Sequence, residues 1–383
     1  MPAANAPTRQ VTMVDLRTQY DRMSEEIDAA VREVIHSTHF IKGPVVQAFE
    51  EELGAYLNVG HAIGCANGTD ALQIAMMALD LEPGAEVIVP SFTYVATAEV
   101  IALLGLTPVM VDVDADTFNL RADLVEAAIT DRTRAIVPVH LFGQSTDMAP
   151  LLELAERHGL RVIEDNAQAI GAEYTFPDGR VAKTGAMGDF GCTSFFPSKN
   201  LGCYGDGGAL FSNDDALAAR ARQVANHGQS RTYYHDVVGV NSRLDAIQAA
   251  ILRVKLPRLD GYNAARRTAA DTYDEAFSGI DALQTPVRAS NSTHVFHQYT
   301  LRVLDGSRDR LREHLNDRGV SHNVYYPVPL YRQGAFAKTV PEGFSLPTTE
   351  LLCAQVVALP MHTEFTDGDL AYVCEAVRSF FEP

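Results

Sequence analysis

Cysteine is scarce in this sequence of 383 residues. The five cysteines are scattered along the chain, and no CxxC pair occurs among them: Cys65, Cys192, Cys203, Cys353 and Cys374. Neither a disulfide framework nor a zinc or iron–sulfur site is therefore indicated, and we expect no metal centre. Isolated, reduced thiols are typical of cytoplasmic proteins, so we expect that location.

Positive charge is also scarce, with 31 lysines and arginines against 49 aspartates and glutamates and a formal net charge of −18. Such an acidic chain is not expected to bind nucleic acid or anionic membranes in general, and an anionic substrate would need a local basic pocket. The start, MPAANAPTRQ, has no apolar signal region, and no apolar run reaches membrane-spanning length. We expect a loosely ordered stretch over the first eight residues.

From about residue 60 the sequence alternates short apolar runs with amphipathic runs. The patterns predict strands in HAIGC, EVIVP, PVMVDVD, RAIVPVHLFG, LRVIEDNAQA, GDFGCTSFF and GGALFSN. Between them, TDALQIAMMALDL, TYVATAEVIALLG and MAPLLELAERHG have helical periodicity, and the last two end in a glycine. This β-α alternation predicts an α/β layered domain with a mostly parallel sheet.

The pattern changes after residue 240. A long helical stretch, LDAIQAAILRVKLPRLDGYNAARRTAADTYDEAF, is expected to break near Pro257. A smaller mixed unit follows, with predicted strands in FHQYTLRVL and VSHNVYY, a helix near SRDRLREHLNDRG and a last helix after Thr366. We therefore expect a large domain over residues 1–255, with the N-terminal segment included, and a small C-terminal α/β domain over residues 256–383.

One lysine, Lys199, stands among aromatics and glycines in FFPSKNLGCYGDGG. A buried ammonium without a partner is costly and tends to lose its proton. Lys199 is therefore either an ordinary lysine at a strand end or a neutral amine that acts as a nucleophile.

Three other groups fall where predicted strands end, which is where α/β sheets bind ligands. Asn67, Gly68, Thr69 and Asp70 lie between a strand and a helix, where free N–H groups suit a phosphate, although a plain N-cap explains them as well. Asp165 ends VIEDNAQA and could be a cap, a metal ligand or the partner of a heterocycle nitrogen.

Tyr94 could be a core residue or could present its ring to a planar ligand. A phosphate cradle, an aromatic plate, a carboxylate and an amine are together what pyridoxal phosphate (PLP) requires. On this interpretation Lys199 forms the Schiff base and then moves the proton, and Asp165 keeps the pyridine nitrogen protonated so that the ring acts as an electron sink.

At these residues the sequence resembles the DegT/DnrJ/EryC1/StrS sugar aminotransferases. The resemblance runs from about residue 10 to the C-terminus and rests on eight ordered motifs: CANGTDALQIA, PSFTYVATAEVIALLG, PVHLFGQ, VIEDNAQAIGA, SFFPSKNLGCYGDGGA, HGQSRTYYH, VGVNSRLDAIQAAIL and YYPVPL. It implies the aspartate-aminotransferase-like type I PLP fold, a large domain with a mostly parallel mixed sheet flanked by helices plus the smaller C-terminal α/β domain. It also implies a homodimer with a shared active site.

The resemblance further implies roles for particular residues. PLP would form an internal aldimine with Lys199 and pass through pyridoxamine phosphate. Its other contacts would be Gly68, Thr69, Asp70, Tyr94, Asp165, Gln168 and Ser194, together with Asn241 from the partner subunit. The sugar, its carboxylate or its diphosphate would meet His227, Arg243, Tyr325 and Tyr326, although close relatives often have histidine where Tyr325 stands.

The resemblance predicts a PLP-dependent transaminase that takes the amino group of L-glutamate, releases 2-oxoglutarate and aminates a nucleotide-linked keto sugar in a ping-pong reaction. The motifs around Tyr94, Lys199 and His227 resemble the branch that acts at C3 of UDP-3-keto-N-acetylhexosamines or their uronic acids, for surface polysaccharide or lipopolysaccharide biosynthesis. The alternatives are a dTDP-3-keto-6-deoxyhexose 3-aminotransferase, a PLP-dependent dehydratase or racemase, and a non-enzymatic sensor. Sugar dehydratases of this fold carry histidine in place of the lysine, so Lys199 favours amino transfer.

Overall fold

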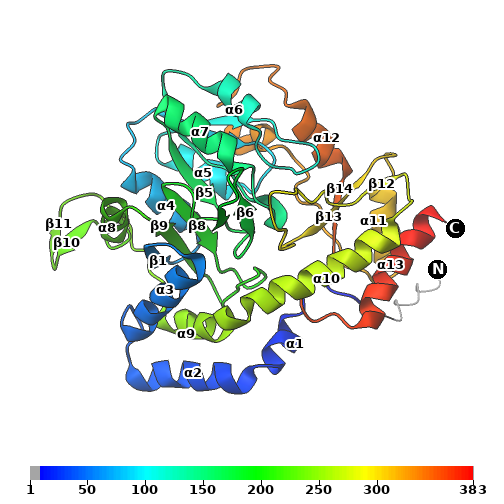
Figure 1. The fold of residues 1–383 in the computed structure, drawn as a ribbon, viewed down its shortest axis with the longest axis horizontal. Helices are drawn as coiled ribbons and strands as arrows, with labels where there is room; N and C mark the ends of the chain where they lie inside the picture. Colours follow the sequence, from blue (N-terminus) through cyan, green and yellow to red (C-terminus); the bar gives the residue numbers. More distant parts are fainter. Residues whose placement is uncertain (1–8, 383) are drawn as a thin grey trace.

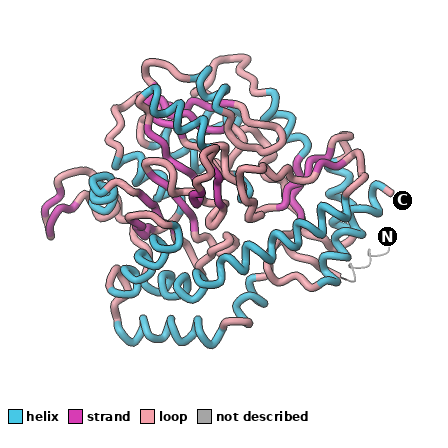
Figure 2. Tube along the Cα trace, in the orientation of Figure 1, coloured by secondary structure: helices cyan, strands magenta, loops and turns pink. Residues whose placement is uncertain are grey.

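The computed structural model describes residues 9–382, so the first eight residues, for which the sequence predicts a loose start, lie outside the described part. A seven-stranded sheet forms its centre (Figures 1 and 2). In spatial order its strands are β1 (His61–Cys65), β9 (Gly208–Ser212), β8 (Phe190–Ser194), β5 (Arg161–Asp165), β4 (Thr133–Ile136), β2 (Glu86–Pro90) and β3 (Thr107–Val111). β9 is antiparallel to both of its neighbours, and the pairs from β8 to β3 are parallel. The predicted mostly parallel sheet is thus confirmed.

Helices cover both faces of this sheet, as strand β2 shows. Val87 and Val89 pack in the cluster that includes α4 (Gly68–Ala78), α5 (Ala96–Leu103) and α8 (Asp215–Val224). Ile88, between them, packs in the cluster of α6 (Ala122–Ala128) and α7 (Met148–His158). Because successive side chains of a strand point to opposite faces, a strand buried on both sides is apolar throughout, as EVIVP is.

The long helical stretch breaks where the sequence predicts. Helix α9 (Ala246–Lys255) ends at a 3₁₀ turn, Leu256–Arg258, and α10 (Leu259–Phe277) continues to the small unit (Figure 1). Pro257 has no N–H to donate, which explains the break. The predicted boundary at residues 255 and 256 coincides with the end of α9, and the division into two domains stays a prediction.

The C-terminal unit has its own antiparallel sheet of β12 (Leu283–Gln284), β13 (Tyr299–Val303) and β14 (Val356–Leu359). Helices α11 (Arg308–Asp317) and α13 (Asp367–Phe381) pack with this sheet in one apolar cluster, and α12 (Pro347–Gln355) precedes β14. Thr366 caps the last helix in a capping box with Asp369, so α13 begins directly after Thr366, as predicted.

The strand predicted in VSHNVYY is wrong. This segment forms only single bridges, Val320 with Val11 and Asn323 with Ala358, and the third strand of the small sheet is β14 instead. Backbone pairing stops at Asn323 because the chain then leaves the sheet towards Tyr325 and Tyr326, which pack beside Phe92 of the large unit.

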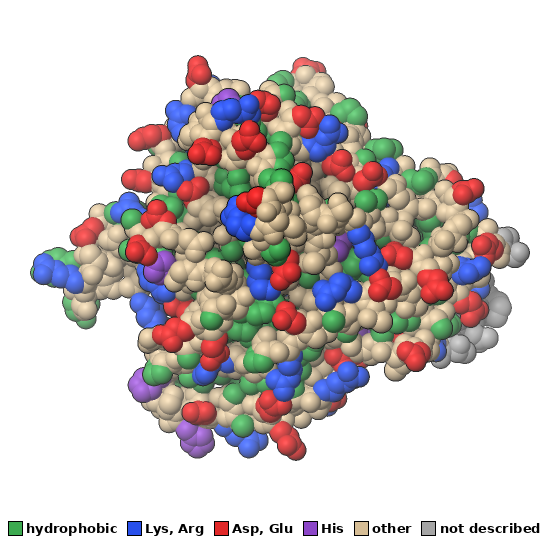
Figure 3. Space-filling view, in the orientation of Figure 1, with side chains coloured by type: hydrophobic (Ala, Val, Ile, Leu, Met, Phe, Trp, Pro, Cys, Tyr) green, Lys and Arg blue, Asp and Glu red, His purple; other side chains and the backbone are tan. Residues whose placement is uncertain are grey.

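The remaining elements are the N-terminal helices, short 3₁₀ turns and two hairpins. The N-terminal helices are α1 (Leu16–Asp21), α2 (Ser24–Ser37) and α3 (Pro44–Leu57); short 3₁₀ turns occupy Leu141–Gly143, Leu330–Arg332 and Gly334–Phe336; and two hairpins are formed by β6 (Glu173–Thr175) with β7 (Val181–Lys183) and by β10 (Gln229–Arg231) with β11 (Tyr234–His235). The second hairpin projects from the body, and hydrophobic side chains surface there in Figure 3. Of the helices described over residues 9–382, none is long and apolar enough to cross a membrane.

Candidate active site

Helix α4 begins directly after β1 with a polar cradle. The side chain of Asn67 caps the helix by accepting from the N–H of Asp70 at 2.8 Å. The N–H groups of Gly68 and Thr69 lie in the first turn, where a helix offers them no internal acceptor. Two free donors at the positive end of a helix dipole can bind a phosphate.

Ser194 closes this cradle from the end of β8. A Cβ placed on Gly68 would lie 2.7 Å from the Cβ of Ser194, so only glycine allows the helix to start this close to the strand. Gly208 is also required, because its Cβ would lie 2.4 Å from the carbonyl of Asn67. The register sets Gly208 opposite both Ser194 and Cys65, which brings β1 and β8 together at the cradle.

Asp165 ends β5, the strand paired with β8 on the side away from β9. Its side chain is buried, Oδ2 accepts from the hydroxyl of Thr97 at 2.7 Å, and Oδ1 accepts from the N–H of Ala167 at 3.1 Å. Two donors therefore hold a desolvated carboxylate in one orientation. Thr97 is not among the predicted site residues, although it stands in the same motif as Tyr94.

Lys199 lies in the loop between β8 and β9, five residues after Ser194. Surrounding protein atoms desolvate its amine and lower its pKa to about 8, and the negative charge of Asp165 opposes this shift. The neutral amine is therefore a minor form near physiological pH, but a much larger fraction than for a lysine in water. The nucleophilic interpretation of this lone lysine agrees with its surroundings.

Tyr94, Gln168 and Tyr326 complete this cluster. Gln168 Nε2 donates to the hydroxyl of Tyr326 at 3.1 Å, and Oε1 accepts from the N–H of Phe142 at 2.7 Å. The rings of Tyr94 and Tyr326 have centroids 6.3 Å apart, and Tyr94 is 57% exposed. Tyr94 is therefore not a core residue but offers a ring face. Tyr325 borders the cluster, with its ring 6.0 Å from that of Tyr326.

A buried pair supports the end of β5 from behind. His140 Nδ1 accepts from the N–H of Thr146, so its Nε2 carries the proton that is shared with Glu164 at 2.8 Å. Glu164 also accepts from the N–H groups of Gly185, Met187 and Gly188. The pair holds the end of the strand that carries Asp165. In the sequence, the histidine in PVHLFGQ is the one sign of this His140–Glu164 pair.

Three predicted residues lie outside this cluster. Asn241 forms a bridge with Asn226, His227 N donates to the carbonyl of Val240 at 2.8 Å, and Arg243 lines a separate cavity. Within the described part of the chain, no hydrogen bond or ion pair joins any of these side chains to Lys199 or Asp165.

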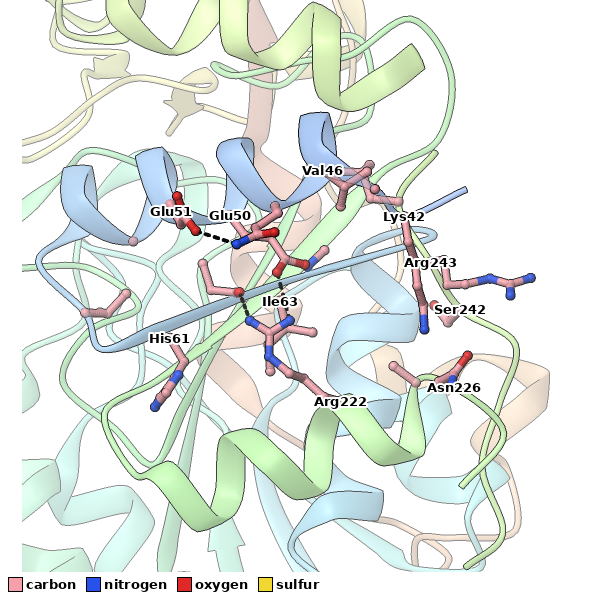
Figure 4. A pocket seen from close by; sticks show the side chains of 18 of the residues that line it. Lys42, Val46, Glu50, Glu51, His61, Ile63, Arg222, Asn226, Ser242 and Arg243 are labelled. Atoms are coloured by element: carbon pink, nitrogen blue, oxygen red, sulfur yellow. Dashed lines mark hydrogen bonds and ion pairs between the residues drawn. The ribbon is translucent and has the colours of Figure 1, made fainter. Parts of the chain in front are cut away.

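The separate cavity has a volume of about 860 Å³ and gathers positive charge (Figure 4). Arg222 is paired with Glu50 at 2.8 Å. Lys42 and Arg243 lie at the same end and form no ion pair with any described residue. Burial and the nearby Arg243 lower the pKa of Lys42. We call this the basic cavity for its Lys42 and Arg243 end, although Glu50 and Glu51 also line it. Sequence patterns gave no sign of Lys42.

The residues around Lys199 fit PLP. The glycine-dependent cradle of free N–H donors suits its phosphate, the buried carboxylate suits a protonated pyridine nitrogen, and the desolvated amine with its lowered pKa suits its aldehyde. No group of three or more potential metal ligands of the His, Cys, Asp and Glu types occurs in residues 9–382. The donor set is that of an organic phosphate cofactor.

Comparison with known proteins agrees with this chemistry. Residues 21–378 match the model of the DegT/DnrJ/EryC1/StrS aminotransferase family. A Pseudomonas aeruginosa protein named UDP-2-acetamido-2-deoxy-3-oxo-D-glucuronate aminotransferase is 45% identical over 369 residues, which cover 96% of this chain and 100% of that protein.

Two further relatives have different names. A Geobacillus stearothermophilus protein named a pleiotropic regulatory protein is 45% identical over 373 residues, 97% of this chain and 98% of that one. The crystal structure of DesV from S. venezuelae, in complex with a ketimine intermediate, superposes with a TM-score of 0.94 at 42% identity and covers 98% of this chain and 100% of its own.

Proposed function

The chain belongs to the DegT/DnrJ/EryC1/StrS family of PLP-dependent aminotransferases, and from this we propose that it aminates C3 of a UDP-linked 3-keto-N-acetylhexosamine or its uronic acid. The observation that carries the substrate proposal is the relative from Pseudomonas aeruginosa, whose name specifies a UDP-linked, N-acetylated 3-keto uronic acid. The presence of Lys199 supports amino transfer, because a regulatory protein would need neither a lysine with a lowered pKa nor a buried, oriented carboxylate beside it.

When bound, the cofactor supplies an aldehyde for Schiff-base chemistry and a pyridine ring that takes up the electrons left on the substrate carbon. Asp165, held by Thr97 and by the N–H of Ala167, would bind the ring nitrogen and keep its proton in place. Gly68, Thr69 and Ser194 would hold the phosphate, with Asp70 next to it. Tyr94 would cover the ring face, and Gln168 would lie near the ring hydroxyl.

Lys199 has two proposed tasks, covalent attachment and proton transfer. Its amine would take up the proton that leaves the α-carbon of the amino donor, L-glutamate, and return a proton when the keto sugar is aminated. A general base works best with a pKa near the operating pH, which is where desolvation sets that of Lys199. A positioned proton shuttle contributes about 10²–10⁴-fold to the rate.

We place Asn241, His227 and Arg243 in a site shared between two copies of the chain, with Asn241 of one copy at the phosphate of the other. Among the described residues, no hydrogen bond or ion pair joins their side chains to Lys199 or Asp165, which supports this arrangement. Exposed Phe40 and Ile41, next to the basic cavity, would be covered in such a homodimer. Arg243 and its neighbour Lys42 would then bind the diphosphate or the uronate carboxylate, together with Tyr325 and Tyr326.

The absorption spectrum of the purified protein, before and after L-glutamate is added, tests the first half-reaction. We expect a yellow protein whose visible absorption band moves to shorter wavelength when L-glutamate is added. The glutamate-treated enzyme is then offered UDP- and dTDP-linked 3-keto sugars. Preference for the UDP sugar supports the proposal, and preference for the dTDP sugar assigns the chain to the 3-amino-6-deoxyhexose branch instead. A yellow protein that ignores glutamate contradicts the proposed donor. We further propose that the enzyme works in the cytoplasm and supplies amino sugars for surface polysaccharide or lipopolysaccharide.

A further inference from the structure

Lys255 is a buried lysine at the C-terminal end of α9, 1% exposed. Its Nζ donates to the carbonyl of Gly202 at 2.8 Å and to Oε1 of Gln19 at 3.0 Å, and it lies 4.4 Å from the ring centroid of Tyr204. No carboxylate in residues 9–382 pairs with it. Burying an ammonium without a counter-ion is costly, so its hydrogen bonds must compensate for much of the lost hydration.

The carbonyl that Lys255 holds belongs to the loop that carries Lys199. This loop closes on itself, since Cys203 N donates to Phe195 O and Lys199 N donates to Phe196 O, each at 2.8 Å. Gly202 packs against the turn on its other side, where a Cβ on Gly202 would lie 2.3 Å from the carbonyl oxygen of Pro197. Gly202 therefore cannot move without moving the segment that contains Lys199.

Helices α9 and α10 hold this loop at alternate residues from Asn200 to Tyr204. Asn200 Nδ2 donates to Asn263 of α10 at 2.7 Å, and the N–H of Tyr204 donates to Gln248 of α9 at 2.9 Å. The Gly202 carbonyl lies between these two contacts, and Lys255 binds it. Lys255 is the charged member of the three, and hydrogen bonds from charged donors are about twice as strong as neutral ones.

We infer that Lys255 is a positioning residue that fixes the Gly202 carbonyl and thereby holds the amine of Lys199 in the orientation needed for covalent attachment of PLP. This rests on the proposed role of Lys199 and does not depend on the sugar substrate. The groups that face Lys255 are the thiol of Cys203, the ring of Tyr204 and the amide of Gln19. Burial lowers the pKa of Lys255 to about 8, so the ammonium is the main form at neutral pH.

The test compares Lys255→Met with the wild-type protein in the absence of any sugar. Methionine matches the length of most of the side chain but donates no hydrogen bond. We expect the variant to fold and to release bound PLP about tenfold faster, as measured by the decay of the visible band after dilution. A looser loop admits water to Lys199, so the pH midpoint for PLP capture by the apo protein should move upwards.

Lys183→Met is the matched control. Lys183 also lies over a tyrosine ring, with Nζ 4.5 Å from the centroid of Tyr56, but it bonds Glu173 and not the Lys199 loop. This control should keep the wild-type release rate and pH midpoint. If Lys255→Met folds but keeps the wild-type PLP release rate and pH midpoint, the inference is overturned. It is also overturned if Lys183→Met changes these two quantities as much as Lys255→Met does.

If Lys255→Met does not fold, Lys255→Gln is tested instead. The glutamine amide ends one bond short of the lysine ammonium, so it cannot keep both the contact with Gly202 and the contact with Gln19. The same faster release is expected, and an unchanged rate again contradicts the inference.

Borohydride trapping of bound PLP followed by peptide mapping separates the two proposals. Trapping at a lysine other than Lys199 refutes its proposed role and the inference together, whereas a protein that attaches PLP at Lys199 but ignores nucleotide sugars leaves the inference standing.

Discussion

The hydroxyl of Thr97 donates a 2.7 Å hydrogen bond to Oδ2 of Asp165, and the two residues lie 68 positions apart in the sequence. Both side chains are buried, so water cannot readily take the place of either one as a hydrogen-bond partner, and loss of this bond would be costly. The bond fixes one oxygen of the carboxylate and leaves the other beside the N–H of Ala167. Thr97 therefore sets the orientation of the Asp165 carboxylate, which would bind the pyridine nitrogen.

Replacement of Thr97 by valine should weaken PLP binding. The substitution preserves shape but removes the donor to a buried carboxylate, which costs about 1.5–3 kcal/mol, or roughly a tenfold or greater loss of affinity. Equilibrium titration of the apo protein with PLP measures the effect. Thr97→Ser, which keeps the hydroxyl, should stay close to wild type, and equal losses in both variants would contradict the orienting role.

Replacement of Lys199 by alanine should abolish turnover but preserve cofactor binding. The phosphate cradle and Asp165 do not depend on the lysine, so PLP should still bind, without the visible band of the lysine-linked form. Spectra and a glutamate-to-2-oxoglutarate assay measure the two properties. Turnover by Lys199→Ala without added amine would falsify the assignment, and partial rescue by small primary amines would support it.

Capture of PLP by the apo protein should depend on pH through Lys199. Desolvation lowers its pKa to about 8, and the neutral amine is the nucleophile, so the capture rate should rise through pH 8 and level off above it. At one pH unit below the midpoint the rate should be about a tenth of the plateau, because about a tenth of the amine is neutral. Stopped-flow absorbance across pH 6–10 gives the profile. A midpoint near that of a free lysine would show that the amine is not desolvated.

Replacement of Gly68 by alanine should damage the cradle. The new Cβ would lie 2.7 Å from the Cβ of Ser194 and 3.2 Å from its Cα, so α4 and β8 must move apart. We expect a loss of about 1–3 kcal/mol in unfolding free energy, together with weaker PLP binding. Gly261→Ala in α10 is the control, since nothing lies within 4 Å of its Cβ position and alanine favours helix. Denaturant unfolding of both variants decides the comparison.

Removal of the positive charge of Arg243 should affect only the sugar half-reaction. If Arg243 and Lys42 bind the anionic part of the nucleotide sugar, Arg243→Met should raise the KM for the sugar about tenfold and leave the glutamate half-reaction unchanged. Lys42→Met should act in the same direction. Arg220→Met is the control, because Arg220 approaches Asp80 outside the cavity. Equal KM values in all three variants would remove the basic cavity from the substrate site.

Much of the molecule follows from the sequence because its signals are local. Buried strands such as EVIVP are apolar throughout, Gly159 ends α7 in a left-handed conformation, and Pro257 interrupts the long helix. The carboxylate and the cradle could be proposed because each stands at a strand end, and the amine because Lys199 stands alone among aromatics and glycines. The exception was VSHNVYY, whose apolar pattern suggested a strand but whose aromatic residues leave the small sheet to pack near Tyr94.

The sequence by itself thus determined which chemical groups are present and the elements that carry most of them. Only the tertiary structure decided which groups meet. Gln168 reaches Tyr326 across 158 positions, Thr97 reaches Asp165, and Lys255 reaches Gly202, whereas no hydrogen bond or ion pair among the described residues joins Arg243 or Asn241 to Lys199. The physical reason is that such contacts depend on strand order and helix packing. These bring distant segments together through burial of the shared core, and local propensity carries no record of them.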